Sequence, residues 1–170
     1  MDRTRADNMG MLATAMNSLA LQEALIQAGN DAVVMSALDI QRMVESFNKD
    51  KAVKYMKNGQ VVIFSCGTGS PFFSTDSGAA LRAAEIEADI FFKATNVDGV
   101  YDKDPNKFSD AVKFDTLSYA EILEKKLGVM DNTAAALAQN SKMPVLVFNL
   151  NDPQNIVKAV LGENIGTIVK

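Results

Sequence analysis

A loop rich in glycine and hydroxyl side chains has the composition of an anion-binding site. It reads Gly67-Thr68-Gly69-Ser70-Pro71-Phe72-Phe73-Ser74-Thr75-Asp76. Its glycines let the backbone approach a ligand closely, and the N–H groups of a following helix attract phosphate. Phe72 and Phe73 can form walls for a base or a ribose. The alternative interpretation is a structural turn between a strand and a helix, capped by Ser or Thr.

Asp76 is unusual in such a loop, because a carboxylate repels phosphate unless a cation lies between them. It can organise a lysine or a magnesium ion, or it can complement the positive end of the helix dipole. The residues alone leave these roles open. The loop lacks the Gly-Lys-Ser/Thr ending of a Walker A motif, and it is not a dinucleotide fingerprint.

A second polar segment, residues 93–105 (KATNVDGVYDKDP), holds three carboxylates, one tyrosine and two lysines. Lys93 is near the end of an apolar run, where an ammonium group can reach a phosphate. The alternative is a surface turn, because Asp98-Gly99 and Asp104-Pro105 are common turn pairs. The oxygen spacing does not match an EF-hand loop.

Apolar runs that alternate with helical segments position these two loops. We expect strands at residues 32–36, 60–66, 89–94, 144–150 and 166–170. We expect helices at residues 8–27 (capped by Asp7 or Asn8), 40–47, 51–57, 75–88, 118–128, 131–142 and 153–162. Ser118 with Glu121 forms a capping box, and Asp131 is an N-cap.

This alternation predicts an α/β fold: a three-layer sandwich with a mainly parallel sheet and helices on both faces. The length of 170 residues suits a single domain over residues 1–170. In such a sheet, ligands bind beyond the carboxyl ends of the strands, which is where both polar loops lie.

Composition excludes several classes of function. The net charge of −4, from 17 Lys and Arg against 21 Asp and Glu, argues against nucleic acid or an anionic membrane as a partner. One cysteine and no histidine exclude Cys/His zinc sites and Ser-His-Asp catalysis, so no metal ligands are assigned. A single cysteine fits a reducing compartment, and we expect the cytoplasm. No apolar run has the length of a membrane span, and the N-terminus does not resemble a signal peptide.

Several blocks, taken together, resemble the bacterial uridylate (UMP) kinases of the amino acid kinase superfamily. They are RADNMGMLATAMN (residues 5–17), SCGTGSPFFSTDSGAALRAAEIEAD (65–89), KATNVDGVYDKDP (93–105), LGVMDNTAAALAQNSKMPVLVFN (127–149) and the end around residues 162–166. The resemblance covers essentially the whole chain. Aspartokinases and glutamate kinases share the fold but not this form of the TGxPFF…TD loop.

The resemblance implies transfer of the ATP γ-phosphoryl group to UMP, giving UDP in pyrimidine nucleotide biosynthesis. It assigns UMP to Asp7, Thr68, Gly69, Ser70, Pro71, Phe72, Phe73, Ser74 and Thr75. It assigns ATP, with magnesium, to Thr95, Asn96, Tyr101 and Asp104, and it gives Asp76 and Lys93 catalytic roles. UMP already carries an ionised phosphate, so no histidine base is needed. A homo-oligomer, a hexamer in the family, with GTP activation and UTP inhibition is also implied.

The sequence departs from the family at its N-terminus. We find no counterpart of the family's KxSGE and GGGN…RG segments, which hold phosphates, and Met1 resembles an internal family position. We therefore expect a chain truncated at the N-terminus, little or no UMP kinase turnover, and an uncovered strand edge at residues 60–66. The alternatives are a nucleotide-binding module without catalysis, another carbamate or carboxylate kinase of this fold, and a structural role in which the helix at residues 8–27 assembles with full-length subunits.

Overall fold

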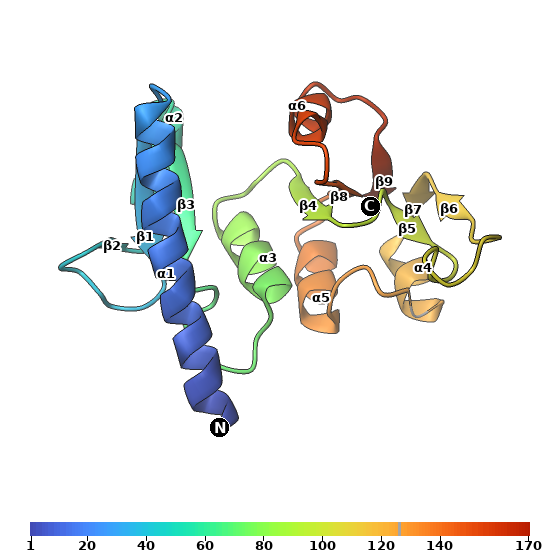
Figure 1. The fold of residues 1–170 in the computed structure, drawn as a ribbon, viewed down its shortest axis with the longest axis horizontal. Coiled ribbons are helices and arrows are strands. Elements are labelled where there is room, and N and C mark those ends of the chain that lie inside the picture. Colours follow the sequence, from blue (N-terminus) through green and yellow to red (C-terminus); the bar gives the residue numbers. More distant parts are fainter. Residues whose placement is uncertain (126) are drawn as a thin grey trace. The chain divides into compact units, whose positions relative to one another are not determined.

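The computed structural model describes residues 1–125 and 127–170. These residues form two compact units, Met1–Ile86 and Glu87–Lys170, each with a β-sheet of its own (Figure 1). The expectation of a single domain over residues 1–170 stays a prediction.

The first unit is a small parallel sheet with helices packed on it. Its elements are α1 (Arg3–Gln27), β1 (Ala32–Ser36), β2 (Glu45–Ser46), α2 (Lys49–Lys57), β3 (Val61–Ser65) and α3 (Thr75–Glu85). The strand order is β2-β1-β3, and both pairings are parallel. Helix α1 packs against β1 and β3, and α2 packs against β3. Because β3 is an outer strand of this sheet, Val61 remains 44% exposed.

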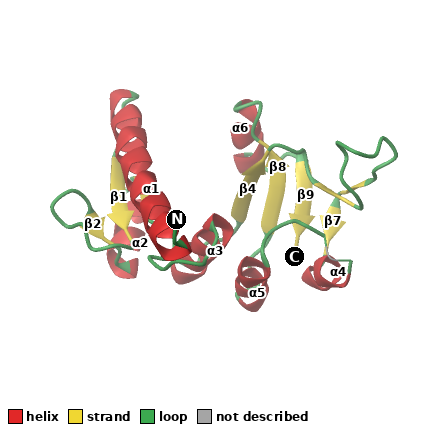
Figure 2. Cartoon of the chain, turned by 60° about the horizontal axis from the view of Figure 1, so that its bottom comes forward, coloured by secondary structure: helices red, strands yellow, loops and turns green. Residues whose placement is uncertain are grey.

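The second unit contains a four-stranded mixed sheet and a short hairpin. Its elements are β4 (Phe91–Thr95), β5 (Val100–Tyr101), β6 (Lys113–Phe114), β7 (Thr116–Leu117), α4 (Tyr119–Glu124), α5 (Asn132–Asn140), β8 (Val145–Asn149), α6 (Gln154–Val160) and β9 (Gly166–Val169). The sheet order is β4-β8-β9-β7, as Figure 2 shows, and only β8 and β9 pair antiparallel within it. The hairpin is formed by β5 and β6.

The expected α/β class, with mainly parallel strands, is confirmed. The core of each unit consists of small and branched apolar side chains on the strands and the facing helices. Met35 and Ala52 are buried in the first unit, and Val145, Phe148 and Ala138 are buried in the second. None of the helices among the described residues is long and apolar enough to cross a membrane.

The expected start of the first helix and the helix expected at residues 40–47 are both wrong. Helix α1 begins at Arg3, because Asp2 accepts a hydrogen bond from the Arg5 N–H (3.1 Å) and no breaker follows. Residues 40–47 do not form a helix. Glu45 and Ser46 pair with the end of β1, and the Phe47 N–H donates to the Ser36 carbonyl (2.8 Å), so sheet pairing prevails over helical spacing.

The predicted caps of α4 and α5 are both confirmed. Ser118 and Glu121 form the capping box of α4, and Asp131 caps α5 through the N–H groups of Thr133 and Ala134. Helix α4 ends at Glu124 instead of residue 128. Lys126, which the expected helix included, lies outside the described residues.

Candidate functional site

The loop between β3 and α3 folds tightly because four of its residues adopt positive φ angles. They are Cys66 (66°), Gly67 (55°), Gly69 (78°) and Phe72 (72°). At Gly69 an added Cβ would lie 2.9 Å from the Ala37 carbonyl oxygen, so only glycine fits there without displacement. The backbone of this loop is therefore strongly constrained.

Helix α1 anchors the loop at both ends. The Thr14 hydroxyl accepts a hydrogen bond from the Cys66 N–H (2.9 Å) and donates to the Met11 carbonyl (2.7 Å). Six residues further along the loop, the Phe72 N–H donates to Asp7 Oδ2 (2.8 Å). The left-handed conformation of Phe72 is thus held by a charge-assisted hydrogen bond from a neighbouring helix.

Arg3 is a residue of this site that the sequence interpretation missed. Its Nε lies 3.5 Å from Asp7 Oδ2, and its guanidinium carbon lies 5.1 Å from the centroid of the Phe72 ring. The i, i+4 spacing of Arg3 and Asp7 was the available signal, once the helix is known to begin before Asp7. Arg3 places a positive charge beside the loop.

Hydrogen bonds order several polar groups within the loop. The Thr68 hydroxyl accepts from the Ser70 N–H and donates to the Ser70 carbonyl, both at 3.2 Å. The Ser74 hydroxyl caps α3 by accepting from the Ser77 N–H (3.0 Å). Side chains from Ser70 to Thr75, apart from half-buried Pro71, are exposed to solvent. The loop therefore presents hydroxyl groups and a helix N-terminus outward.

Asp76 lies in the first turn of α3 and is half-buried. In this position its carboxylate complements the helix dipole. The same helix lies close against the loop, because an added Cβ on Gly78 would be 2.9 Å from the Gly67 Cα. The positions of Asp76 and the loop are thus coupled through α3.

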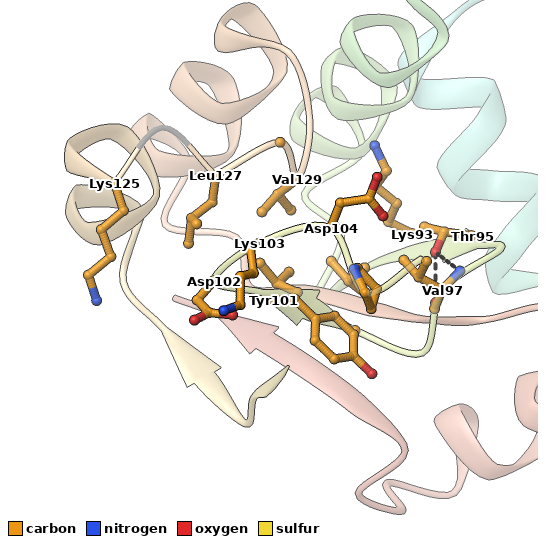
Figure 3. A pocket seen from close by; sticks show the side chains of 15 residues that line it. Lys93, Thr95, Val97, Tyr101, Asp102, Lys103, Asp104, Lys125, Leu127 and Val129 are labelled. Carbon is orange, nitrogen blue, oxygen red and sulfur yellow. Dashed lines mark hydrogen bonds between the residues drawn. The ribbon is translucent and has the colours of Figure 1, made fainter. Parts of the chain in front are cut away.

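A pocket of about 520 Å³ lies in the second unit. It is lined by the end of β4, by the hairpin strand β5 with the loop that follows it, and by a segment before α5 that contributes residues 125 and 127–129. Figure 3 shows Leu127 and Val129 extending from that segment toward the loop that carries Lys103 and Asp104. The lining combines apolar walls with three lysines and two carboxylates: Lys93, Lys103, Lys125, Asp102 and Asp104. This size and composition suit a small polar ligand.

Four of the predicted residues, Lys93, Thr95, Tyr101 and Asp104, line this pocket together. The fifth, Asn96, does not line it; its carbonyl accepts a hydrogen bond from the Asn149 side chain (3.0 Å). The remaining predicted residues, from Asp7 to Asp76, lie in the first unit. The ligand-binding role of both groups stays a prediction.

Hydrogen bonds shape the loops that line the pocket. The Thr95 hydroxyl accepts from the Val97 N–H (3.0 Å) and donates to the Val97 carbonyl (2.8 Å). The Tyr101 hydroxyl donates to Asp98 (2.5 Å), which lowers the pKa of Asp98 and raises the pKa of Tyr101. The Asn106 N–H is the main cause of a lowered pKa at Asp104. Asp98 and Asp104 are therefore carboxylates at neutral pH.

Two further parts of the pocket lining, Lys125 and the wall formed by Leu127 and Val129, were not predicted from the sequence. Lys125 follows α4, where its ammonium group lies 5.1 Å from the centroid of the Phe114 ring and 3.5 Å from Glu121 Oε1. It therefore links α4 to the hairpin strand β6. Because Lys125 lies twenty positions after the end of the predicted loop, only the folded chain shows that it shares the pocket.

Comparison with known proteins defines the class of this chain. Residues 1–149 match the amino acid kinase family, so the chain belongs to this family.

Three solved structures are similar to it over 100% of its length. UMP kinase from Ureaplasma parvum is 43% identical with a TM-score of 0.95, and the chain covers 73% of it. UMP kinase from Bacillus anthracis is 34% identical with a TM-score of 0.96, and the chain covers 70% of it. Uridylate kinase from Archaeoglobus fulgidus is 35% identical with a TM-score of 0.74, and the chain covers 74% of it.

Proposed function

We propose that this protein is a uridylate kinase that transfers the γ-phosphoryl group of ATP to UMP, giving UDP for pyrimidine nucleotide biosynthesis. The observation that carries the proposal is the likeness, over the whole chain, to three solved UMP or uridylate kinases at 34–43% identity. The single buried cysteine fits a reducing compartment, and the proposed location is the cytoplasm.

The loop from Thr68 to Thr75, with Asp7, is the proposed UMP site. Its exposed hydroxyl groups and the N-terminus of α3 offer hydrogen-bond donors to the UMP phosphate. The exposed rings of Phe72 and Phe73 provide apolar surface for uracil. Asp7 has one oxygen bonded to the Phe72 N–H, and its second oxygen can accept from a ribose hydroxyl.

The pocket of the second unit is the proposed ATP site. Leu127 and Val129 offer an apolar wall to adenine, whereas Lys93 and Lys103 offer positive charge to the phosphates. Thr95, Asn96, Tyr101 and Asp104 complete the predicted contacts with ATP.

The proposed reaction is an in-line transfer. A UMP phosphate oxygen forms a bond to the γ-phosphorus while the bond to the β–γ bridging oxygen breaks, and ADP leaves. The attacking oxygen is already ionised, so the protein acts by positioning and by neutralising charge. Lys93 is the proposed phosphate ligand, and Asp76 is the proposed organiser of polar groups around the transferred phosphoryl.

Magnesium fits this scheme as a companion of ATP. Residues 1–125 and 127–170 contain no cluster of three or more acidic or cysteine side chains that could hold a metal ion alone. Mg²⁺ commonly takes one or two carboxylates together with substrate phosphates, and Asp102 and Asp104 are the carboxylates that line the pocket. The ion would supply neutralisation of phosphate charge.

A coupled assay of ADP release with UMP, CMP, aspartate and glutamate as acceptors tests this proposal. Any turnover is expected with UMP alone and at a low rate, and Lys93→Ala should lower kcat further while the exposed-lysine control Lys54→Ala should not. Phosphorylation of a different acceptor would instead favour another amino acid kinase activity. If calorimetry detects UMP and ATP binding without turnover, the chain is a nucleotide-binding module.

The apolar face of α1 supports a proposed homo-oligomer, a hexamer as the family resemblance implies. Met9, Leu12 and Met16 lie on one face of α1 and are exposed, Met16 by 72%. Light scattering of Met16→Lys should show smaller particles than wild type, whereas Asn17→Lys, on a different face, should not change the mass. Adding GTP and UTP to the kinase assay tests the proposed activation and inhibition.

A further inference from the structure

Thr167 on β9 connects the hairpin to the sheet. Its side chain is completely buried (0% exposed), although it does not line the pocket. Its hydroxyl accepts a hydrogen bond from the Val100 N–H (2.8 Å) and donates one to the Phe114 carbonyl (2.5 Å). Val100 and Phe114 face each other in register across the β5–β6 hairpin. One hydroxyl group thus fastens both strands of the hairpin to β9.

The hairpin approaches Thr167 closely because of Gly99. A Cβ added to Gly99 would lie 2.6 Å from Thr167 Oγ1 and 2.9 Å from Lys113 Cδ. Both contacts are shorter than van der Waals separation, so a side chain at this position would push the hairpin away from β9. The glycine and the hydroxyl group therefore act together to set one position for the hairpin.

The position of this hairpin determines one side of the pocket. Gly99, Val100 and Tyr101 line the pocket, and the segment from Asp102 to Pro105 continues the lining. On the other strand, Phe114 leads within two residues to β7, which pairs with β9. The Val100 strand continues from β4 through residues 96–99, and its N–H reaches β9 through the Thr167 hydroxyl.

We propose that Thr167 is a positioning residue of the donor-nucleotide pocket, which acts by holding the β5–β6 hairpin and therefore Tyr101 and Asp104 in their binding positions. The inference rests on the proposed function, in which this pocket takes ATP. Thr167 itself is buried behind the hairpin and touches no substrate. Its loss should therefore weaken ATP binding and leave UMP binding unchanged.

The test compares Thr167→Val, which keeps the branched shape and removes the hydroxyl, with Thr167→Ser, which keeps the hydroxyl. Thr116→Val is the matched control, because Thr116 lies on the adjacent strand β7 with its side chain exposed. Calorimetric titration of the full chain with MgATP and, separately, with UMP gives the two affinities. Amide hydrogen exchange at Val100, followed by NMR without nucleotide, reports on the hairpin directly.

Thr167→Val should raise the Kd for MgATP about tenfold, since a lost buried hydrogen bond has an effect of this order. It should also accelerate exchange of the Val100 amide, with the Kd for UMP unchanged. Thr167→Ser should restore both properties to near the wild-type values. Thr116→Val should behave as wild type throughout.

Two results would overturn the inference in distinguishable ways. If wild type binds MgATP and Thr167→Val binds it equally well while Val100 exchanges faster, the hairpin moves without consequence and the positioning role is wrong. Equal losses of ATP and UMP affinity would show a general structural defect instead. If wild type does not bind MgATP at all, the proposed function fails, and the inference fails with it.

Gly99→Ala keeps the test decisive if Thr167→Val does not fold. It retains the hydroxyl and displaces the hairpin by steric contact. Faster Val100 exchange with weaker MgATP binding would support the inference, whereas faster exchange with unchanged MgATP binding would refute it.

Discussion

Phe72 allows backbone strain and ligand contact to be measured separately within the proposed UMP site. Its φ of 72° lies in the left-handed region, and its side chain is 62% exposed. Phe72→Gly and Phe72→Ala both remove the ring and its contact with Arg3 at 5.1 Å. Both keep the N–H that donates to Asp7. The two variants therefore differ only in the Cβ.

That single difference should make the glycine variant the more stable one. A residue with a Cβ costs about 1–2 kcal/mol in the left-handed region. Glycine loses about 0.4–1 kcal/mol more than alanine because its unfolded chain has greater conformational freedom. The balance favours Phe72→Gly by roughly 0.5–1 kcal/mol. At an ordinary loop position the order is reversed.

Phe73 provides the matched control, because it is the neighbouring exposed phenylalanine and its φ lies outside the left-handed region. Phe73→Ala should be more stable than Phe73→Gly. Urea unfolding followed by circular dichroism measures all four free energies, with equal m-values as the condition for comparing midpoints. If alanine is the more stable substituent at both positions, the strained turn is not present in solution and the reasoning is refuted.

The same variants test the role of the aromatic ring. Stacking of a base on an aromatic side chain contributes about 1–3 kcal/mol. UMP affinity should therefore fall about tenfold or more in both Phe72→Gly and Phe72→Ala, and by similar factors. Unchanged affinity for UMP in both variants would show that the ring is not a wall of the acceptor site.

Three further predictions concern Asp7 and Gly69, at the β3–α3 loop, and the buried Tyr119 of α4. Asp7→Ala should lower the free energy of unfolding by about 1 kcal/mol, because the Phe72 N–H loses its acceptor. Asp7→Asn should retain most of the wild-type stability, so equal urea midpoints for the two variants would contradict this prediction. Gly69→Ala should cost about 1–2 kcal/mol and weaken UMP binding, because φ is 78° and the Cβ meets the Ala37 carbonyl at 2.9 Å; a wild-type urea midpoint would argue against it. Burial raises the pKa of Tyr119 from 10.0 to about 12, so the folded state retains the phenol proton more strongly than the unfolded state. The free energy of unfolding of wild type should therefore fall by about 2 kcal/mol as the pH rises from 10 to 12. Tyr119→Phe should be less stable near neutral pH, where the hydroxyl donates to the Met143 carbonyl (2.6 Å), but should lack this alkaline loss; parallel alkaline unfolding curves would refute the assignment.

Much of the secondary structure follows from the sequence because local signals act without competition there. The apolar run at Ala32–Ser36 forms β1 with the expected bounds. Ser118 and Glu121 form the expected capping box, since both partners lie within one helical turn. The residues that mark each of these features are close in sequence, although β1 also needs its distant partner β3 to form the sheet.

Two details that the sequence did not predict depend on hydrogen-bonding partners that are distant in sequence. Residues 40–47 have helical spacing, but the end of β1 offers Glu45 and Ser46 a parallel partner strand. Asp7 resembles a helix cap, yet its carboxylate binds the Phe72 N–H sixty-five positions away. Local pattern cannot predict these two long-range hydrogen-bonding partners, whereas the start of α1 at Arg3 follows from the local cap Asp2.

The proposed sites also combine residues that local composition reveals with residues whose role depends on a long-range contact. Gly67 and Thr68 are recognisable from composition, because a ligand-binding loop needs glycine and hydroxyl groups. Thr14 and Thr167 are not recognisable, although each fixes a loop through one hydroxyl group that accepts a backbone N–H from a distant segment.

Such supports belong to a rigid helix or strand and are more restrained than the loops they hold, which is what a site requires for accurate positioning. Each threonine accepts the loop N–H and also donates to a carbonyl, so replacement by valine breaks two hydrogen bonds with little change in shape. If this reasoning is correct, Thr14→Val and Thr167→Val have opposite selectivity: the first weakens UMP binding and the second weakens ATP binding. A structural role alone would weaken the binding of both nucleotides in both variants.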